Sequence, residues 1–291
     1  MDCKPKIIVV LGPTASGKSA LAVRLAKELN GEIISADSRQ VYKGLDIGTG
    51  KITKKEMLGI PHHLLDVADP KKVFTVQNFK DLAEEAIDKI ISKGKLPIVC
   101  GGTGFYIQAI VENFIYPEVP PNQKLRKQLS KKTTSELFMM LAKKDVRRAA
   151  NIDGKNKVRL IRALEIVEAL GRIPTLDIGC PKYDVLQIGI KTDEKTLKEK
   201  IYKRLIFRLK QGMLKEAEKL HTKGLSWKRM EELGLEYRYL ARFLQKHYKN
   251  PLDYARGKQE MIEQLNKEIW HYAKRQMTWF KRDKNIHWIS L

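Results

Sequence analysis

Short apolar runs alternate with amphipathic segments over the first 116 residues. Lys6–Leu11, Glu32–Ser35 and Leu96–Cys100 are short apolar runs bounded by glycine or polar turn residues, the pattern of buried strands. Lys18–Leu29 and Val76–Ile91 instead repeat apolar residues every three or four positions, which predicts amphipathic helices. Strands that alternate with helices predict a parallel sheet with helical crossovers.

The alternation stops after Tyr116, where three prolines fall within residues 117–121. The segments that follow have helical periodicity with no strand between them, over Lys124–Leu129, Ser135–Lys144 and Asn156–Leu170. A second break runs from Pro174 to Pro181. We therefore predict an all-helical insertion domain at residues 117–183.

Strand and helix patterns resume beyond this insertion. Asp184–Ile190 has the character of a strand that returns to the sheet, and Ile286–Ile289 that of a closing strand. Between them, helices are predicted over Thr196–Lys223, with an interruption at Gly212, and over Pro251–Arg282. Residues 1–116 and 184–291 are thus predicted to form one core domain.

A phosphate-binding motif lies between the first predicted strand and helix. Residues 12–19 read Gly-Pro-Thr-Ala-Ser-Gly-Lys-Ser and match G-x-x-x-x-G-K-[ST], whose backbone N–H groups point inward at phosphate oxygens. We assign di- or triphosphate binding to Gly12, Pro13, Thr14, Ala15, Ser16, Gly17, Lys18 and Ser19. Lys18 supplies a mobile cation, and the Ser19 hydroxyl can ligate Mg²⁺. The predicted fold is therefore α/β: a P-loop NTPase-like parallel sheet core flanked by helices, with an all-helical insertion.

The residues after the other two strands bear on the reaction. A P-loop motor needs an acid at the end of a second apolar strand to hold Mg²⁺ and orient water, but Leu96–Cys100 ends in Gly-Gly-Thr-Gly. Only Glu32–Ser35 leads to an acid, Asp37, which favours a transferase. At the carboxyl edge of the sheet Asp37 could accept a proton, and Thr103 would face the same edge. Both residues could instead cap the following segment, and the sequence leaves these alternatives open.

The basic residues are concentrated in the later part of the chain. The net charge is +22; residues 1–116 hold 16 Lys and Arg against 13 Asp and Glu, residues 117–190 hold 15 against 8, and residues 195–291 hold 24 against 11. A surplus of this size predicts a polyanionic partner, with nucleic acid favoured over an anionic membrane surface. A solvated basic face is the alternative, but it predicts a closer balance of acids.

Composition narrows the class of protein. With 43% hydrophobic residues the chain is expected to be globular, and its apolar runs are far shorter than the ~20 residues of a membrane span. We find no signal-peptide pattern and expect a cytoplasmic protein. Cys3, Cys100 and Cys180 are widely spaced, which predicts unpaired thiols without a zinc or redox motif.

Several blocks together resemble one enzyme family. They are the P-loop, Ala-Asp-Ser-Arg-Gln at 36–40, Val-Tyr-Lys-Gly-Leu-Asp-Ile-Gly at 41–48, Gly-Ile-Pro-His-His-Leu-Leu-Asp at 59–66, Gly-Gly-Thr-Gly-Phe-Tyr at 101–106, Arg-Leu-Ile-Arg-Ala-Leu-Glu at 159–165 and Ala-Lys-Arg-Gln-Met-Thr-Trp at 273–279. In this order they resemble the tRNA dimethylallyltransferases, and the resemblance covers nearly the whole chain.

The resemblance implies a prenyl transfer to RNA. Dimethylallyl diphosphate would donate its dimethylallyl group, with Mg²⁺, to N6 of the adenosine beside the anticodon (position 37) of a tRNA, and the P-loop would hold the departing diphosphate. The catalytic residues implied are Asp37, as proton acceptor, Thr103 and Lys18. Arg204 matches an arginine that reaches the diphosphate. Contacts to the tRNA anticodon stem-loop are implied for Asp37, Ser38, Arg39, Gln40, Thr103, Arg126, Arg159, Leu160, Ile161 and Arg162.

Some points stay open within this resemblance. Arg208 lies one turn after Arg204, so either arginine could reach the diphosphate, and Gly48–Lys51 and Gly234–Arg238 depart from the family pattern. We expect a monomer that does not bind membranes. The alternatives are a small-molecule or nucleoside kinase, an adenylate isopentenyltransferase that modifies a free nucleotide, and an RNA-binding protein with a regulatory nucleotide. The basic surplus disfavours a free nucleotide as acceptor.

Overall fold

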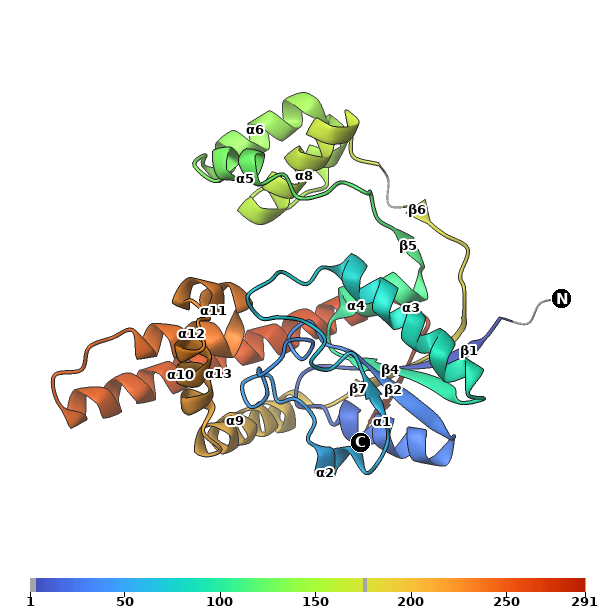
Figure 1. Ribbon diagram of the computed structural model, residues 1–291, viewed down its shortest axis with the longest axis horizontal. Helices are drawn as coiled ribbons and strands as arrows, with labels where there is room; N and C mark the ends of the chain where they lie inside the picture. Colours follow the sequence, from blue (N-terminus) through green and yellow to red (C-terminus); the bar gives the residue numbers. More distant parts are fainter. Residues whose placement is uncertain (1–3, 175–176, 291) are drawn as a thin grey trace. The chain divides into compact units, whose positions relative to one another are not determined.

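The chain divides into two compact units in a computed structural model that describes residues 4–174 and 177–290 (Figure 1). Cys3 therefore lies outside the described residues. The core unit comprises Met1–Asn113 and Pro181–Leu291, and the helical unit comprises Phe114–Cys180. The sequence placed these boundaries at 117 and 183. The helical unit begins before the prolines at 117–121 because β5 (Phe114–Ile115) pairs antiparallel with β6 (Asp177–Ile178). The prediction that the insertion is all-helical is therefore wrong.

The core unit is built on a six-stranded parallel sheet in the order β3-β2-β4-β1-β7-β8. Its strands are β1 (Lys6–Leu11), β2 (Gly31–Ala36), β3 (His62–His63), β4 (Leu96–Gly101), β7 (Asp184–Lys191) and β8 (Ile286–Ser290). The predicted parallel α/β fold is confirmed. Because the strands are parallel, β2, β4 and β1 end side by side at one edge, and the loops after them meet there.

Helices cover both faces of this sheet (Figure 1). One face packs against α1 (Lys18–Glu28), and the other packs against α3 (Val76–Ser92) and α4 (Gly104–Val111). The α1 side buries Leu21, Ala22, Ala26, Ile33 and Ile98. The α3 side buries Ile34, Phe79, Ile87, Val99 and Tyr106. Adjacent strand residues thus face opposite layers, which explains why these strands are continuous apolar runs.

The C-terminal helices share a second apolar core. They are α9 (Glu194–Lys210), α10 (Met213–Thr222), α11 (Trp227–Leu233), α12 (Leu235–Leu244) and α13 (Pro251–Phe280). Gly212 has φ 99° and separates α9 from α10, at the predicted interruption. Helix α13 starts at Pro251 behind the Asn250 cap and spans 30 residues. Its buried face carries Met261, Leu265, Ile269 and Ala273.

The helical unit contains α5 (Gln123–Leu129), α6 (Thr134–Lys144), α7 (Val146–Ala150) and α8 (Lys157–Leu170). Leu137, Leu141, Leu160 and Leu164 form the centre of its core. The short α7 was not predicted. It has only five residues and follows α6 directly, since Asp145 both ends α6 and caps α7 by accepting the Arg148 N–H. A polar side chain likewise caps each of the other three helices.

One further helix, α2 (Lys54–Met57), lies in the core unit between β2 and β3. Within residues 4–174 and 177–290, no helix has the length and apolarity needed to cross a membrane.

Candidate functional site

The P-loop joins β1 to α1 at the carboxyl edge of the sheet. Ala15 adopts φ 64°, a left-handed conformation of the kind found in anion-binding loops. Lys18 Nζ donates to the Pro13 carbonyl at 3.2 Å, so the ammonium lies over its own loop. Burial lowers the pKa of Lys18. The loop is therefore shaped for an anion, with a desolvated cation above it.

Arg204 of α9 reaches this loop from a distant part of the chain. Its guanidinium donates to the Thr14 hydroxyl. Burial, with the nearby Arg208 charge, lowers the pKa of Arg204 to about 9, so it stays charged at neutral pH. Arg208 instead donates to the Gly48 carbonyl at 3.3 Å and pairs with Glu236 at 3.2 Å. Of the two arginines, Arg204 contacts the P-loop.

Asp37 and Thr103 belong to one hydrogen-bonded network at the ends of β2 and β4. Asp37 Oδ1 accepts the N–H groups of Arg39 at 2.8 Å and Gln40 at 3.3 Å. Thr103 Oγ1 accepts the Ser38 N–H at 3.0 Å. Thr103 occupies the N-cap position of α4, yet its side chain makes no cap bond to that helix. Thr103 therefore holds the 37–40 loop, whereas Asp37 does cap its turn.

Tyr272 of α13 joins the same network and was not predicted. A hydrogen bond links its hydroxyl to Thr103. Burial, together with the Asp37 carboxylate, raises the pKa of Tyr272. Its position 169 residues after Thr103 in the sequence leaves no local signal that could have identified it.

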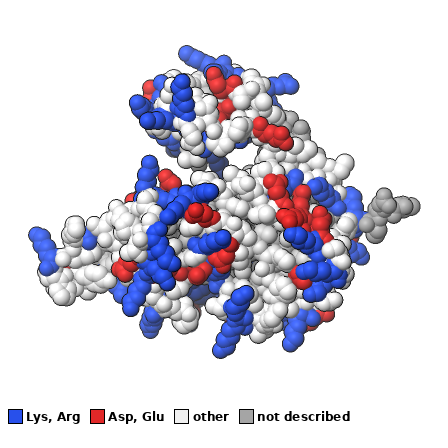
Figure 2. Space-filling model, viewed as in Figure 1, with Lys and Arg blue, Asp and Glu red and all other residues white. Residues whose placement is uncertain are grey.

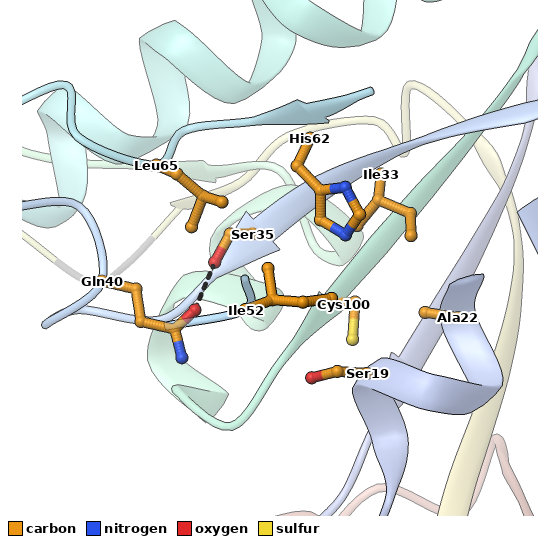
Figure 3. Close-up of a pocket in the computed structure, with 9 residues that line it drawn as sticks. All are labelled: Ser19, Ala22, Ile33, Ser35, Gln40, Ile52, His62, Leu65 and Cys100. Atoms are coloured by element: carbon orange, nitrogen blue, oxygen red, sulfur yellow. Dashed lines mark hydrogen bonds between the residues drawn. The ribbon is translucent and has the colours of Figure 1, made fainter. Parts of the chain in front are cut away.

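A cavity opens beside the head of α1 (Figure 3). Its empty space is about 280 Å³, counted to the open mouth, and it is lined by Ser19, Ala22, Ile33, Ser35, Gln40, Ile52, His62, Leu65 and Cys100. Burial raises the pKa of the Cys100 thiol to about 11, so the thiol is neutral at pH 7. Burial also lowers the pKa of His62. The cavity thus combines neutral polar groups with an apolar wall and begins next to the phosphate loop.

The neighbouring His63 has a structural role. Its Nε2 lies 2.8 Å from Oε2 of the buried Glu32, which also pairs with the more exposed Lys93 and Lys95. Within the described residues no group of three or more His, Cys, Asp or Glu could hold a metal.

In the helical unit, Arg126 and Arg162 converge on one buried acid. Glu165 accepts from Arg126 Nε at 2.9 Å and Nη2 at 2.8 Å, and from Arg162 Nη1 at 2.6 Å. Burial alone would raise the pKa of Glu165, but these bonds and one from the Asn122 N–H hold it at about 2. Both guanidinium groups remain about one-third exposed.

The other residues of the predicted contact strip on α8 differ in exposure. Arg159 is exposed and Ile161 is half-buried. Leu160 is fully buried, so its side chain packs in the core of the helical unit and offers no surface to an RNA.

A second unpredicted residue, Glu216 of α10, shapes the loop beside Arg208. Its carboxylate accepts the N–H groups of Asp46, Ile47 and Gly48 at 2.7–3.0 Å. The Tyr237 hydroxyl donates to the same carboxylate at 2.7 Å. This loop and its anchor are separated by about 170 residues, which again leaves no local sequence signal.

Known proteins are similar to this chain over most of its length. The family model described as IPP transferase matches residues 40–283. A tRNA dimethylallyltransferase 2 of Treponema denticola is 42% identical over 294 residues, covering 98% of this chain and 96% of that protein.

Solved structures give the same result. The tRNA isopentenylpyrophosphate transferase of Bacillus halodurans has a TM-score of 0.72 and 36% identity, covering 99% of this chain and 90% of that one. A eukaryotic dimethylallyltransferase, studied acting on tRNA, has a TM-score of 0.82 and 26% identity, with 98% and 74% covered. The chain therefore belongs to the tRNA dimethylallyltransferase family, the IPP transferases.

Proposed function

We propose that this chain transfers the dimethylallyl group of dimethylallyl diphosphate to N6 of the adenosine adjacent to the anticodon (position 37) of tRNA, releasing diphosphate. The observation that carries the proposal is that a cationic phosphate loop and the Asp37–Thr103 network lie at the same edge of the sheet. The phosphate loop suits the leaving diphosphate, and the Asp37–Thr103 network suits the acceptor base.

The donor side stabilises the departing diphosphate. As the C1–O bond breaks, positive charge develops on the allylic carbon and negative charge on the diphosphate. The P-loop amides, the Lys18 ammonium and the Arg204 guanidinium face the negative charge from a desolvated site, where such donors are most effective. Removing one preorganised donor costs roughly 3–4 kcal/mol of barrier.

The acceptor side binds the attacking amine. N6 of the adenine attacks C1, the N–C bond forms, and the N6 proton passes to the Asp37 carboxylate. Thr103 positions the 37–40 loop that carries this carboxylate. Because N6 of a stacked base is poorly accessible, the adenosine is turned out of the anticodon loop to reach the site.

Magnesium fits the donor set at the head of α1. Mg²⁺ takes most of its coordination from water and phosphate oxygens, so it does not need a cluster of protein ligands. The Ser19 hydroxyl, which lines the cavity beside the P-loop, would supply one oxygen. When bound, Mg²⁺ neutralises charge on the departing diphosphate.

The tRNA is bound mainly through its phosphates. Basic side chains outnumber acidic ones on both units in the view of Figure 2, as the count along the chain requires. Ser38, Arg39, Gln40 and Thr103 serve as contacts near the flipped base, and Arg126, Arg159, Ile161 and Arg162 serve as contacts on the helical unit. Such binding weakens steeply with salt. We also propose that the enzyme acts in the cytoplasm and as a monomer.

The test is transfer of label from radiolabelled dimethylallyl diphosphate to total tRNA. We expect Mg²⁺-dependent labelling, with N6-dimethylallyl adenosine as the only labelled nucleoside after digestion. Parallel reactions contain AMP in place of tRNA, or ATP without the prenyl donor. Labelling of AMP instead of tRNA would identify an adenylate prenyltransferase, and ATP turnover without RNA would identify a kinase.

A further inference from the structure

Gln276 of α13 is one of the few buried polar side chains of the core unit, and the proposed reaction gives it no role. Only 7% of the residue is exposed. Its Oε1 accepts the Thr14 N–H at 2.8 Å, and its Nε2 donates to the Gly102 carbonyl at 2.7 Å. One side-chain amide thus connects two loops that are 88 residues apart in the sequence.

These two loops are the two halves of the site. Thr14 belongs to the P-loop, and its hydroxyl also receives Arg204. Gly102 directly precedes Thr103, which holds the turn that carries Asp37. Gln276 therefore lies between the groups proposed to hold the leaving diphosphate and those proposed to receive the base.

The approach of α13 to the 102–104 loop is close. A Cβ atom on Gly102 would lie 2.3 Å from Gln276 Nε2, so no other residue fits there without displacing the glutamine. One turn later Trp279 covers Gly104, and one turn earlier Tyr272 bonds Thr103. Positions 272, 276 and 279 share one helical face, so successive turns of α13 contact all three residues of the 102–104 loop.

Only a side-chain amide of this length satisfies both loops. The site needs an acceptor for an N–H group and a donor for a carbonyl, which a carboxylate, a thioether or an alkyl group cannot both provide. A buried backbone N–H or C=O group left without its partner bears the full free-energy cost of its desolvation. We expect the loop to shift until that group finds another partner.

We infer that Gln276 is a positioning residue that fixes the spacing between the P-loop and the Asp37–Thr103 loop, and hence between the allylic carbon and the attacking N6. The inference rests on the proposed function. Backbone groups of the two loops engage both polar atoms of its side chain, so we place its action on these loops and not on either substrate. Its effect is on the alignment of the two, where an error of about 1 Å can cost on the order of 100-fold in rate.

The experiment compares Gln276→Met with a matched control, Gln187→Met. Gln187 of β7 is also buried, and its amide donates to Asp283, just beyond the C-terminus of α13, at 2.7 Å. For wild type and both variants we would measure the thermal midpoint, the Kd for tRNA, the Kd for magnesium diphosphate and the single-turnover rate with both substrates saturating.

We expect the rate of Gln276→Met to fall about 100-fold while its Kd for tRNA changes less than threefold. Gln187→Met should lose a similar amount of thermal stability and keep its rate within threefold of wild type. A Gln276→Met rate within threefold of wild type, or an equal loss in Gln187→Met, overturns the inference. An inactive wild type would contradict the proposed function instead.

A second variant covers the case in which Gln276→Met does not fold. Gln276→Glu is isosteric and keeps the acceptor for the Thr14 N–H, but it replaces the donor to Gly102 with a carboxylate oxygen that repels the Gly102 carbonyl. Its saturated rate should fall at least tenfold with tRNA affinity retained. A rate equal to wild type would overturn the inference in the same way.

Discussion

Asp37 is both a turn cap and the proposed base, and two substitutions separate these roles. Asp37→Asn removes the charge but keeps an oxygen that can accept the N–H groups of Arg39 and Gln40. Asp37→Ala removes both. Loss of a cap of this kind costs about 1 kcal/mol of stability, whereas a general base contributes about 10²- to 10⁴-fold to the rate.

We therefore expect both variants to lose at least 100-fold in single-turnover rate, while only Asp37→Ala unfolds at a measurably lower temperature. The assay is transfer of labelled dimethylallyl to tRNA at saturating substrate, with thermal unfolding and filter binding of tRNA measured on the same preparations. The Kd for tRNA should stay within a few-fold of wild type, because phosphate contacts supply most of the affinity.

The result that refutes this reasoning is an active Asp37→Asn. If that variant transfers at more than a third of the wild-type rate, the carboxylate is only a cap, and another group receives the N6 proton. Weakened tRNA binding with an unchanged saturated rate would instead make Asp37 a binding residue.

Three further predictions test other parts of the chain. Arg204→Met should lower kcat by 10²- to 10³-fold. It should not lower the thermal midpoint, because the pKa of Arg204, lowered to about 9, shows that burial of this charge is unfavourable. The control is Lys203→Met, at an exposed position. Glu165→Gln should destabilise the chain by about 3 kcal/mol at pH 7. This difference should shrink as the pH falls from 4.5 towards 2, because a carboxylate with a lowered pKa stabilises the folded state only while it is ionised. Gly50→Ala should cost about 2 kcal/mol, because its Cβ would lie 1.6 Å from Arg208 Nη2 and because Gly50 has φ 59°. The steric part of the cost should vanish in an Arg208→Met background and the part due to backbone strain should remain; an undiminished cost would show that strain accounts for all of it.

Local patterns were sufficient to predict the sheet. Burial on one or both faces requires apolar residues at regular positions, so it can be predicted from the local sequence. Examples are the apolar runs of β1 and β7 and the strong apolar stripe of α3. Helix α4 was not predicted, because it starts directly after Gly-Gly-Thr, a composition typical of loops. Helix α2 was not predicted either, although Thr53 and Glu56 form a capping box, which is a local sequence signal.

The site could be predicted only in part, for a physical reason. The P-loop is a local motif, and its residues are adjacent in sequence. The partners of its residues are not: Thr14 binds Arg204 from 190 residues away and Gln276 from 262 residues away. No periodicity or spacing reports such pairs, so resemblance to a family could name the motifs without explaining how they meet.

The order of the strands explains why this sheet edge suits a two-substrate transfer. The P-loop follows β1, the Asp37 turn follows β2, and β4 lies between them. Two strand spacings place the loops roughly 10 Å apart, enough for a leaving group and an attacking atom on opposite sides of one carbon. The middle strand ends in Gly-Gly-Thr-Gly, and a Cβ on Gly101 would lie 2.1 Å from the Ala36 carbonyl. An acidic side chain in that loop, as in P-loop motors, would occupy this space and repel the departing diphosphate. Gly102→Asp should abolish transfer and should weaken magnesium diphosphate binding more than Gly102→Asn does, because both displace Gln276 and only the aspartate adds a negative charge beside the diphosphate.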